Sequence, residues 1–151
     1  MPPICPKDFR EVFDRLVARL PKECASYEVA QADSAKLHVC IQPANGRAAP
    51  IRSIVGGEGV TLIFGRGAVF EVPSEGRRYT NLPCSEEVYT LCSAVTKGMF
   101  EEIITSLGSR VVGARAKIDL GDSVASSMWR EVLFYLPWKT KKDSLIYPAY
   151  Y

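Results

Sequence analysis

Apolar residues recur at helical spacing in the first twenty residues of the chain. They follow the order i, i+3, i+4, i+7, i+8 and i+11, which places them on one stripe of an α-helix: Phe9, Val12, Phe13, Leu16, Val17 and Leu20. Pro6 suits the first turn of such a helix, and Pro21 follows its last turn. The pattern predicts an amphipathic helix over residues 7–20.

The segment after this helix alternates between apolar and polar positions instead. Every second residue is apolar around residues 27–29 and again over residues 35–41. Successive side chains of a β-strand point to opposite faces, so this period predicts strands with one buried face. Residues 42–50 contain two prolines and an Asn-Gly pair, which predicts a loop before a short strand at residues 51–55.

Five glycines surround two short apolar runs in the segment GGEGVTLIFGRGAVFEVP, residues 56–73. Such turns either cradle phosphates or form the corners of β-hairpins. A dinucleotide site needs G-x-G-x-x-G at the start of a helix, but Leu62 and Phe70 stand where the third glycine would be, and no P-loop lysine follows. Both glycine pairs lead into β-rich runs. The segment therefore predicts hairpin turns and no nucleotide cofactor.

A second helix is predicted over residues 85–97. Ser85 suits its N-cap, and two glutamates follow in the first turn, where the helix dipole favours acidic side chains. The apolar stripe of this helix comprises Val88, Leu91, Cys92 and Val95. Lys97 followed by Gly98 is typical of a helix C-terminus.

A helix that continues to Leu107 is the alternative, because apolar residues extend the stripe that far. Gly98 inside such a helix would cost about 1 kcal/mol relative to alanine. We therefore expect a break, then a β-hairpin over residues 100–120 with its turn at residues 107–109. A last strand is expected over residues 129–137.

Together these elements predict an α+β fold. We expect an antiparallel β-sheet meander with two amphipathic helices packed on one face of the sheet. The chain shows no internal repeat and no linker, so residues 1–151 are expected to form a single globular domain. Residues 137–151 are interpreted as an aromatic C-terminal tail.

Composition and charge narrow the possible classes of function. Hydrophobic residues make up 47% of the chain and charged residues 24%, the usual globular balance. The net charge is only +2, and the basic residues are spread over both halves, whereas nucleic-acid-binding proteins concentrate them. The N-terminus lacks the apolar stretch of a secretory signal, and no run is long enough to span a bilayer. We expect a cytoplasmic protein with no membrane partner, for which nucleic acid is a poor candidate.

The cysteine pattern agrees with this location. The five cysteines are odd in number and not closely paired, so we expect reduced thiols: Cys5, Cys24, Cys40, Cys84 and Cys92. No two cysteines are two to four residues apart, and the chain has a single histidine. These spacings predict no metal site.

The titratable residues predict no catalytic set. His38 and Cys40 point the same way on a strand, but they stand about 7 Å apart, beyond the roughly 3 Å that an activated thiolate needs. His38 is interpreted as solvated or structural; a Ser–His–Asp site that uses it stays open, although no G-x-S-x-G motif supports one. The glutamate pairs at residues 86–87 and 101–102 are interpreted as helix-dipole acids and a solvated strand edge. We predict that the chain is not an enzyme.

The C-terminal segment mixes aromatic and basic side chains. Trp138 and three tyrosines lie among three lysines, and rings interleaved with bases can stack on single-stranded nucleic acid. A tail that packs its rings on the sheet and leaves the lysines in solvent explains the pattern better, because the rest of the chain offers no basic field. A protein interface is the third interpretation.

The segments GVTLIFGRGAVFEVP and EEVYTLCSAVTKGMFEEI carry a resemblance to a known family. Over roughly residues 60–118 the order of strands, a helix ending in lysine-glycine and a hairpin resembles small α+β immunity proteins of bacterial polymorphic-toxin systems. Those proteins often carry histidines just after the phenylalanine-glycine corner. Here Arg66, Ala68 and Phe70 occupy these positions, so any role of those histidines is absent.

The resemblance implies a cytoplasmic binding protein that neutralises a cognate toxin by stoichiometric occlusion. The candidate partner-binding residues are those favoured at interface hot spots: Arg66, Arg77, Arg78, Tyr79, Trp138 and Tyr147. Inhibitors of basic nucleases need an acidic face, and a net charge of +2 favours a toxin that modifies a protein or a small molecule. A small enzyme or ligand-binding domain is the first alternative, and a nucleic-acid-binding module is the second.

Overall fold

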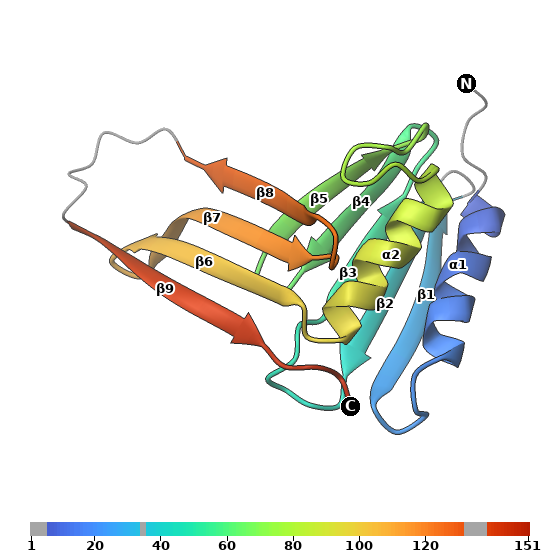
Figure 1. The fold of residues 1–151 in the computed structure, drawn as a ribbon, viewed down its shortest axis with the longest axis horizontal. Helices are drawn as coiled ribbons and strands as arrows, with labels where there is room; N and C mark the ends of the chain where they lie inside the picture. Colours follow the sequence, from blue (N-terminus) through green and yellow to red (C-terminus); the bar gives the residue numbers. More distant parts are fainter. Residues whose placement is uncertain (1–5, 34–35, 132–138) are drawn as a thin grey trace.

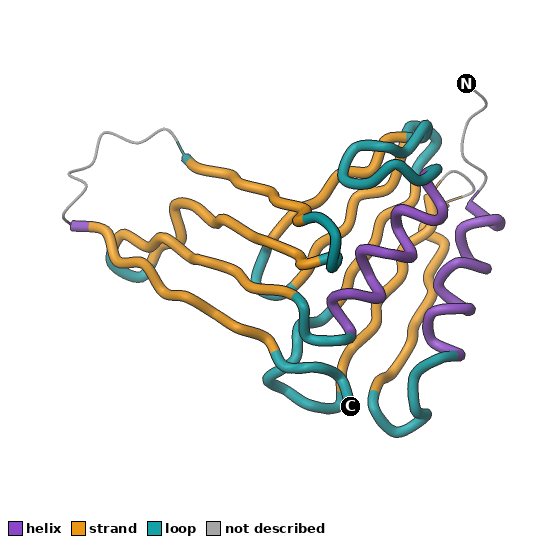
Figure 2. Tube along the Cα trace, viewed as in Figure 1, coloured by secondary structure: helices purple, strands orange, loops and turns teal. Residues whose placement is uncertain are grey.

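The computed structural model describes residues 6–33, 36–131 and 139–151. This part of the chain forms two α-helices and nine β-strands (Figures 1 and 2). In chain order these are α1 (Pro6–Ala18), β1 (Ala25–Asp33), β2 (Lys36–Pro43), β3 (Ile51–Val55), β4 (Gly59–Phe64), β5 (Ala68–Pro73), α2 (Cys84–Thr96), β6 (Phe100–Leu107), β7 (Arg110–Asp119), β8 (Val124–Arg130) and β9 (Thr140–Tyr147). The predicted α+β class is confirmed.

The strands form two antiparallel sheets. The first has five strands in the order β1-β2-β3-β4-β5, so each strand pairs with its neighbour along the chain. The second has four strands in the order β8-β7-β6-β9. Figure 1 shows α2 between α1 and the four-stranded sheet, which extends away from the helices.

One side of the five-stranded sheet supplies most of the hydrophobic core. Burial alternates along its strands, so the β4–β5 hairpin buries every second side chain: Val60, Leu62, Phe64, Ala68, Phe70 and Val72. The predicted stripes of both helices are buried as well, including Phe13 on α1 and Val95 on α2, except that Val17 is half-buried. Both helices contact this sheet and each other. The hydrophobic patterns therefore identified the core residues of these elements correctly.

The second sheet joins the same core at one end. Phe100 on β6 and Ile118 on β7 lie opposite each other and are buried in the cluster that contains the α2 stripe. The ring centroid of Phe100 lies 5.9 Å from that of Phe64 on β4. The Ser127 hydroxyl on β8 donates a hydrogen bond to the Val69 carbonyl on β5. These contacts place the edge strands β5 and β8 of the two sheets against each other.

The hairpin interpretation of the glycine-rich segment is confirmed. Gly65 lies in the β4–β5 turn with φ of 62°, a conformation that side chains beyond glycine rarely adopt. A Cβ at Gly65 would lie 2.8 Å from the Glu102 carboxylate and 2.8 Å from the Tyr147 hydroxyl. The turn therefore also needs glycine here because there is no room for a side chain. The helix break is confirmed too, because α2 ends at Thr96 and Gly98 has φ of 79°.

The expectation of a single sheet was wrong. The loop at residues 74–83 and α2 carry the chain away from β5, and the remaining strands then pair among themselves. Sheets most often have about four to six strands, so two sheets of five and four strands are of ordinary size. Period-two patterning shows which face of a strand is buried, but it does not show which strand is its neighbour.

The N-cap of α2 also differs from the prediction. The helix begins at Cys84, with Pro83 at the N-cap and no side-chain capping bond, so Ser85 lies inside the first turn. The reason is the carboxylate of Glu87, two residues after Ser85. Glu87 faces the preceding loop and accepts hydrogen bonds from its backbone, which sets where the helix starts.

The C-terminal segment is a strand over most of its described length. β9 pairs with β6 from Phe100↔Tyr147 to Leu107↔Thr140, so the segment is part of the second sheet and not a tail. Its lysines at 141 and 142 are exposed, as expected of a solvated face. The last predicted strand begins earlier, at Val124, and its residues 132–137 lie outside the described residues.

Candidate protein-binding surface

A buried glutamate holds the loop before α2 in place. Glu87 is fully buried, and its carboxylate accepts hydrogen bonds from the backbone N–H groups of Arg78 (3.2 Å), Tyr79 (3.2 Å) and Thr80 (2.8 Å). The Thr80 hydroxyl donates a fourth bond of 2.6 Å. A carboxylate that accepts several N–H donors at once replaces the water that burial removes. The loop that carries three of the predicted binding residues, Arg77, Arg78 and Tyr79, is therefore anchored at its backbone.

Tyr79 fixes this loop against the edge strand of the first sheet. Its ring centroid lies 5.2 Å from that of Phe70 in an edge-on arrangement, and its hydroxyl accepts a hydrogen bond of 3.2 Å from the Glu71 backbone N–H. Burial raises the pKa of the Tyr79 phenol. The Arg78 guanidinium lies 5.5 Å from the centre of the Tyr79 ring, within cation–π range. The exposed Arg78 side chain thus lies near this anchored ring.

Strand β8 brings further interface-type side chains to the same place. Met128 is 69% exposed, and Trp129 is half-buried beside it. A hollow of about 240 Å³ is lined by both, together with residues of β5 and the loop: Val69, Glu71, Arg78, Tyr79, Ser127, Met128 and Trp129. We call these seven residues the junction surface, because it lies where the two sheets meet.

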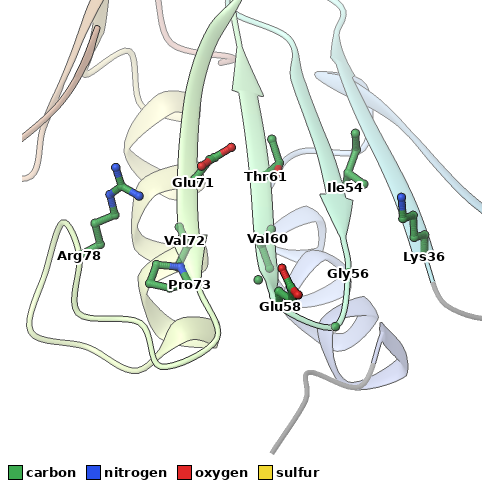
Figure 3. A pocket seen from close by; sticks show the side chains of 12 residues that line it. Lys36, Ile54, Gly56, Glu58, Val60, Thr61, Glu71, Val72, Pro73 and Arg78 are labelled. Atoms are coloured by element: carbon green, nitrogen blue, oxygen red, sulfur yellow. The ribbon is translucent and has the colours of Figure 1, made fainter. Parts of the chain in front are cut away.

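A larger hollow adjoins the junction surface on the five-stranded sheet (Figure 3). It measures about 570 Å³ and shares Glu71 and Arg78 with the junction surface. Figure 3 shows its labelled side chains spread across the strands, with Lys36 at one end and Arg78 at the other. Its lining contains both acids and bases, including Glu58 in the glycine-rich hairpin. The two hollows together make one extended surface that is polar at its margins.

The structure separates the predicted binding residues into two groups. Arg77, Arg78 and Tyr79 lie together on the loop that Glu87 anchors, and both arginines are exposed. Arg66 lies apart from these three, in the β4–β5 turn, and its side chain is also exposed. Its backbone N–H donates a hydrogen bond of 3.0 Å to Glu102. Trp138 lies outside the described residues.

Tyr147 was expected at the surface, and this expectation was wrong. The side chain is only 9% exposed, and its ring stacks on Phe100 with centroids 5.2 Å apart. Its hydroxyl donates a hydrogen bond of 2.6 Å to Glu102. Burial, followed by this hydrogen bond, raises the pKa of Tyr147. Tyr147 therefore joins β9 to the core and offers nothing to a partner.

Two features of the structure were not predicted from the sequence. Glu87 and Glu102 were interpreted as a helix-dipole acid and a solvated strand edge, yet both are fully buried. Met128 and Trp129 were not considered, because a methionine and a tryptophan in a strand are usually core residues. The sequence pattern could have indicated that Met128 is exposed. Side chains alternate along a strand, so Ala125, Ser127 and Trp129 face one side of β8 and Met128 faces the other.

The described cysteines and the histidine form no disulfide and no cluster of three metal ligands. Cys24, Cys40, Cys84 and Cys92 are free, and no cluster of three potential metal ligands occurs among the described residues. Burial raises the pKa of the Cys84 thiol to about 11 and raises that of Cys92 as well, which keeps both thiols protonated at neutral pH. His38 is half-exposed and lies opposite Ala30 and Ile54 on the five-stranded sheet.

Comparison with known proteins adds no relative to this picture. No protein-family model matches the chain, and no curated protein or solved structure is significantly similar to it. Neither described helix is both long enough and apolar enough to cross a membrane.

Proposed function

We propose that this chain is an immunity-type binding protein that neutralises a cognate cytosol-acting bacterial toxin by stoichiometric occlusion. The observation that supports the proposal best is the junction surface, where Arg78, Tyr79, Met128 and Trp129 meet around one hollow. Tyrosine, tryptophan, methionine and arginine are the side chains enriched at the centres of protein interfaces. The four come from two segments about fifty residues apart in the chain.

The rigidity of the junction surface supports the same proposal. The Arg78–Thr80 backbone is held by the Glu87 carboxylate, and β8 is held to β5 by the bond from Ser127 to Val69. A surface that is ordered before binding loses less conformational entropy when a partner docks. A tight inhibitor benefits from this property directly.

The proposal includes one finer point of architecture. Both helices are taken to cover one face of the five-stranded sheet, which leaves the opposite face to solvent and to the partner. Arg52 and Glu71 are exposed on that opposite face, and Glu71 belongs to the junction surface. The partner is expected to lie over the junction surface and reach onto this face.

The charges of the surface bear on the class of toxin. Arg78 is the only base and Glu71 the only acid within the junction surface, and the exposed Arg77 lies beside Arg78 in the same loop. A surface without an acidic excess does not complement the basic groove of a nuclease. We therefore propose a toxin that modifies a protein or a small molecule in the cytoplasm.

Co-expression tests this function. A toxin encoded beside this gene should stop growth alone and be tolerated with this protein, and Trp129→Ala or Arg78→Glu should weaken the rescue. Arg47→Glu is the matched control, because Arg47 is an exposed arginine in the loop between β2 and β3. Thermal melting of each variant confirms that the fold is intact. A harmless neighbouring protein, or rescue unaffected by both junction variants, contradicts the proposal.

A further inference from the structure

A second hollow lies on the four-stranded sheet, on the face that the core does not use. The register places Arg115, Met128 and Ile103 in one row across β8, β7 and β6. The next row contains Arg130, Gly113, Thr105 and Lys142. A hollow of about 550 Å³ lies over these two rows. It is within the size range of small-molecule sites.

Glycine at position 113 contributes to this hollow. Its row neighbours Arg130 and Thr105 carry side chains, while Gly113 carries none; a Cβ there would lie 3.7 Å from Arg130 Cγ, so the Arg130 stem lies along the buried glycine. Neighbouring strands are about 4.8 Å apart, and long cationic side chains on either side can therefore reach over the glycine. Arg115, Arg130 and Lys142 are all exposed and line the hollow.

The described lining of the hollow contains three cations and no carboxylate. Arg115 and Lys142 make no ion pair or hydrogen bond in the part of the chain that the structure describes. Arg130 and Thr140 have interactions of their own, so the uncompensated charge is that of Arg115 and Lys142. Lys117, two residues from Arg115 on β7, lies opposite Glu101 in the register, so a carboxylate faces it across the strands. The two rows that contain Arg115 and Lys142 have no acidic residue in the register.

We propose that this hollow binds the phosphate group of a small phosphate monoester. A phosphate monoester carries a charge of about −1.5 to −2 at neutral pH, which matches the two uncompensated cations better than the single charge of a carboxylate does. Arginine guanidinium groups bind phosphate oxygens in a bidentate manner, and the Thr105 hydroxyl can donate a further bond. Ile103 and Met128 offer apolar contact to the organic part of the ligand.

A nucleic-acid strand fits these observations less well. Its affinity grows with the number of phosphates contacted along a track of basic residues. The cations here surround one point of a sheet, and the adjoining junction surface contains Glu71. One phosphate group over Gly113 is the arrangement that the register supports.

Titration followed by two-dimensional NMR tests this site on the full chain. The probes are phenyl phosphate, benzoate, inorganic phosphate and a ten-nucleotide single-stranded DNA. Phenyl phosphate should shift the amide signals of Gly113 and Thr105 with a dissociation constant below about 1 mM, and inorganic phosphate and benzoate should bind several-fold more weakly. Arg115→Met and Lys142→Met should each weaken phenyl phosphate binding by about tenfold. Lys117→Met is the control and should change it less than about twofold.

Four results would overturn the assignment. Absence of shifts at Gly113 and Thr105 with 10 mM phenyl phosphate removes the site, and equal loss in all three variants reduces it to general charge attraction. Equal affinity for inorganic phosphate or benzoate removes the monoester class. Shifts with the DNA but not with phenyl phosphate assign the hollow to nucleic acid. All three substitutions are at exposed positions, and their spectra report whether each variant is folded.

Discussion

Glu87 connects the stability of the protein to its proposed binding surface. One of its oxygens accepts bonds from the Tyr79 and Thr80 N–H groups and from the Thr80 hydroxyl, and the other accepts the bond from Arg78. No water is needed to satisfy this buried carboxylate. The position of Arg78 and Tyr79 therefore depends on a residue that a partner would never touch.

Glu87→Gln should lower the free energy of unfolding by about 2–3 kcal/mol, because the amide NH₂ would face an N–H donor instead of accepting from it. Chemical denaturation measures the loss, and partner binding should weaken with it. Glu86→Gln is the control: Glu86 forms an exposed ion pair with Arg15 at 3.2 Å, and such a pair contributes at most about 1 kcal/mol. Equal stability of the two variants would show that the Glu87 bonds contribute little.

Because of Cys84, the free energy of unfolding should fall as the pH becomes alkaline. Its thiol has a pKa of about 11 in the folded protein, above its ordinary value of 9.0, because burial disfavours the thiolate. A folded-state pKa above the unfolded one stabilises the fold below the unfolded pKa, and that contribution is lost as pH rises through the folded pKa. The free energy of unfolding should therefore fall between about pH 9 and 11, and Cys84→Ala should reduce the fall. Denaturation curves at pH 8, 9, 10 and 11 measure it, and an unchanged fall in Cys84→Ala would contradict this assignment.

At the scale of elements, the β4–β5 turn is wedged against the second sheet. Gly65→Ala should destabilise the protein by about 2 kcal/mol or more, because its Cβ would meet the buried Glu102–Tyr147 pair and its φ is unfavourable. Thermal melting measures the change. Gly46→Ala is the control, since Gly46 is exposed and a Cβ there would meet nothing within 4 Å. A melting temperature that Gly65→Ala leaves at the control value would mean that the turn is not packed this way.

Helix α2 packs on both sheets, so its buried stripe is the most sensitive position for charge. The Val95 side chain is completely buried, with 0% of its surface exposed to solvent. Val95→Asp should unfold the protein, because an unpaired buried carboxylate costs several kcal/mol and total stability is about 5–15 kcal/mol. Circular dichroism measures the loss of structure. Thr90→Asp, at a partly exposed position of the same helix, should stay folded; a folded Val95→Asp protein with wild-type melting would show that this face of α2 is not in the core.

At the scale of the whole molecule, local patterns predicted both helices and the strands up to β7, but not β9, the start of β8 or the assembly of the strands into two sheets. Both helices, the glycine turns and the 100–120 hairpin follow from periodicity and turn residues, which act over a few positions. The split into two sheets, the burial of Glu87 and Glu102, and the pairing of β9 with β6 depend on contacts between distant segments.

For the candidate binding surface too, residue type predicted some members, and contacts between distant segments determined the others. Arg78 and Tyr79 could be proposed from residue type alone. Their neighbours Met128 and Trp129 come from another sheet, and no local pattern indicates that β5 and β8 lie together. Tyr147 was misplaced for the same reason, because its partner Glu102 is 45 residues away in the chain.

The most direct test of the proposed function is the stoichiometry and affinity of the purified pair, measured by isothermal titration calorimetry. The account predicts one molecule of this protein per toxin molecule. It also predicts that Trp129→Ala raises the dissociation constant by about thirtyfold or more, which corresponds to a hot-spot loss of about 2 kcal/mol, while Arg47→Glu leaves it unchanged. If the wild-type protein does not bind the toxin, or if substoichiometric amounts abolish its activity by turnover, occlusion through the junction surface is contradicted.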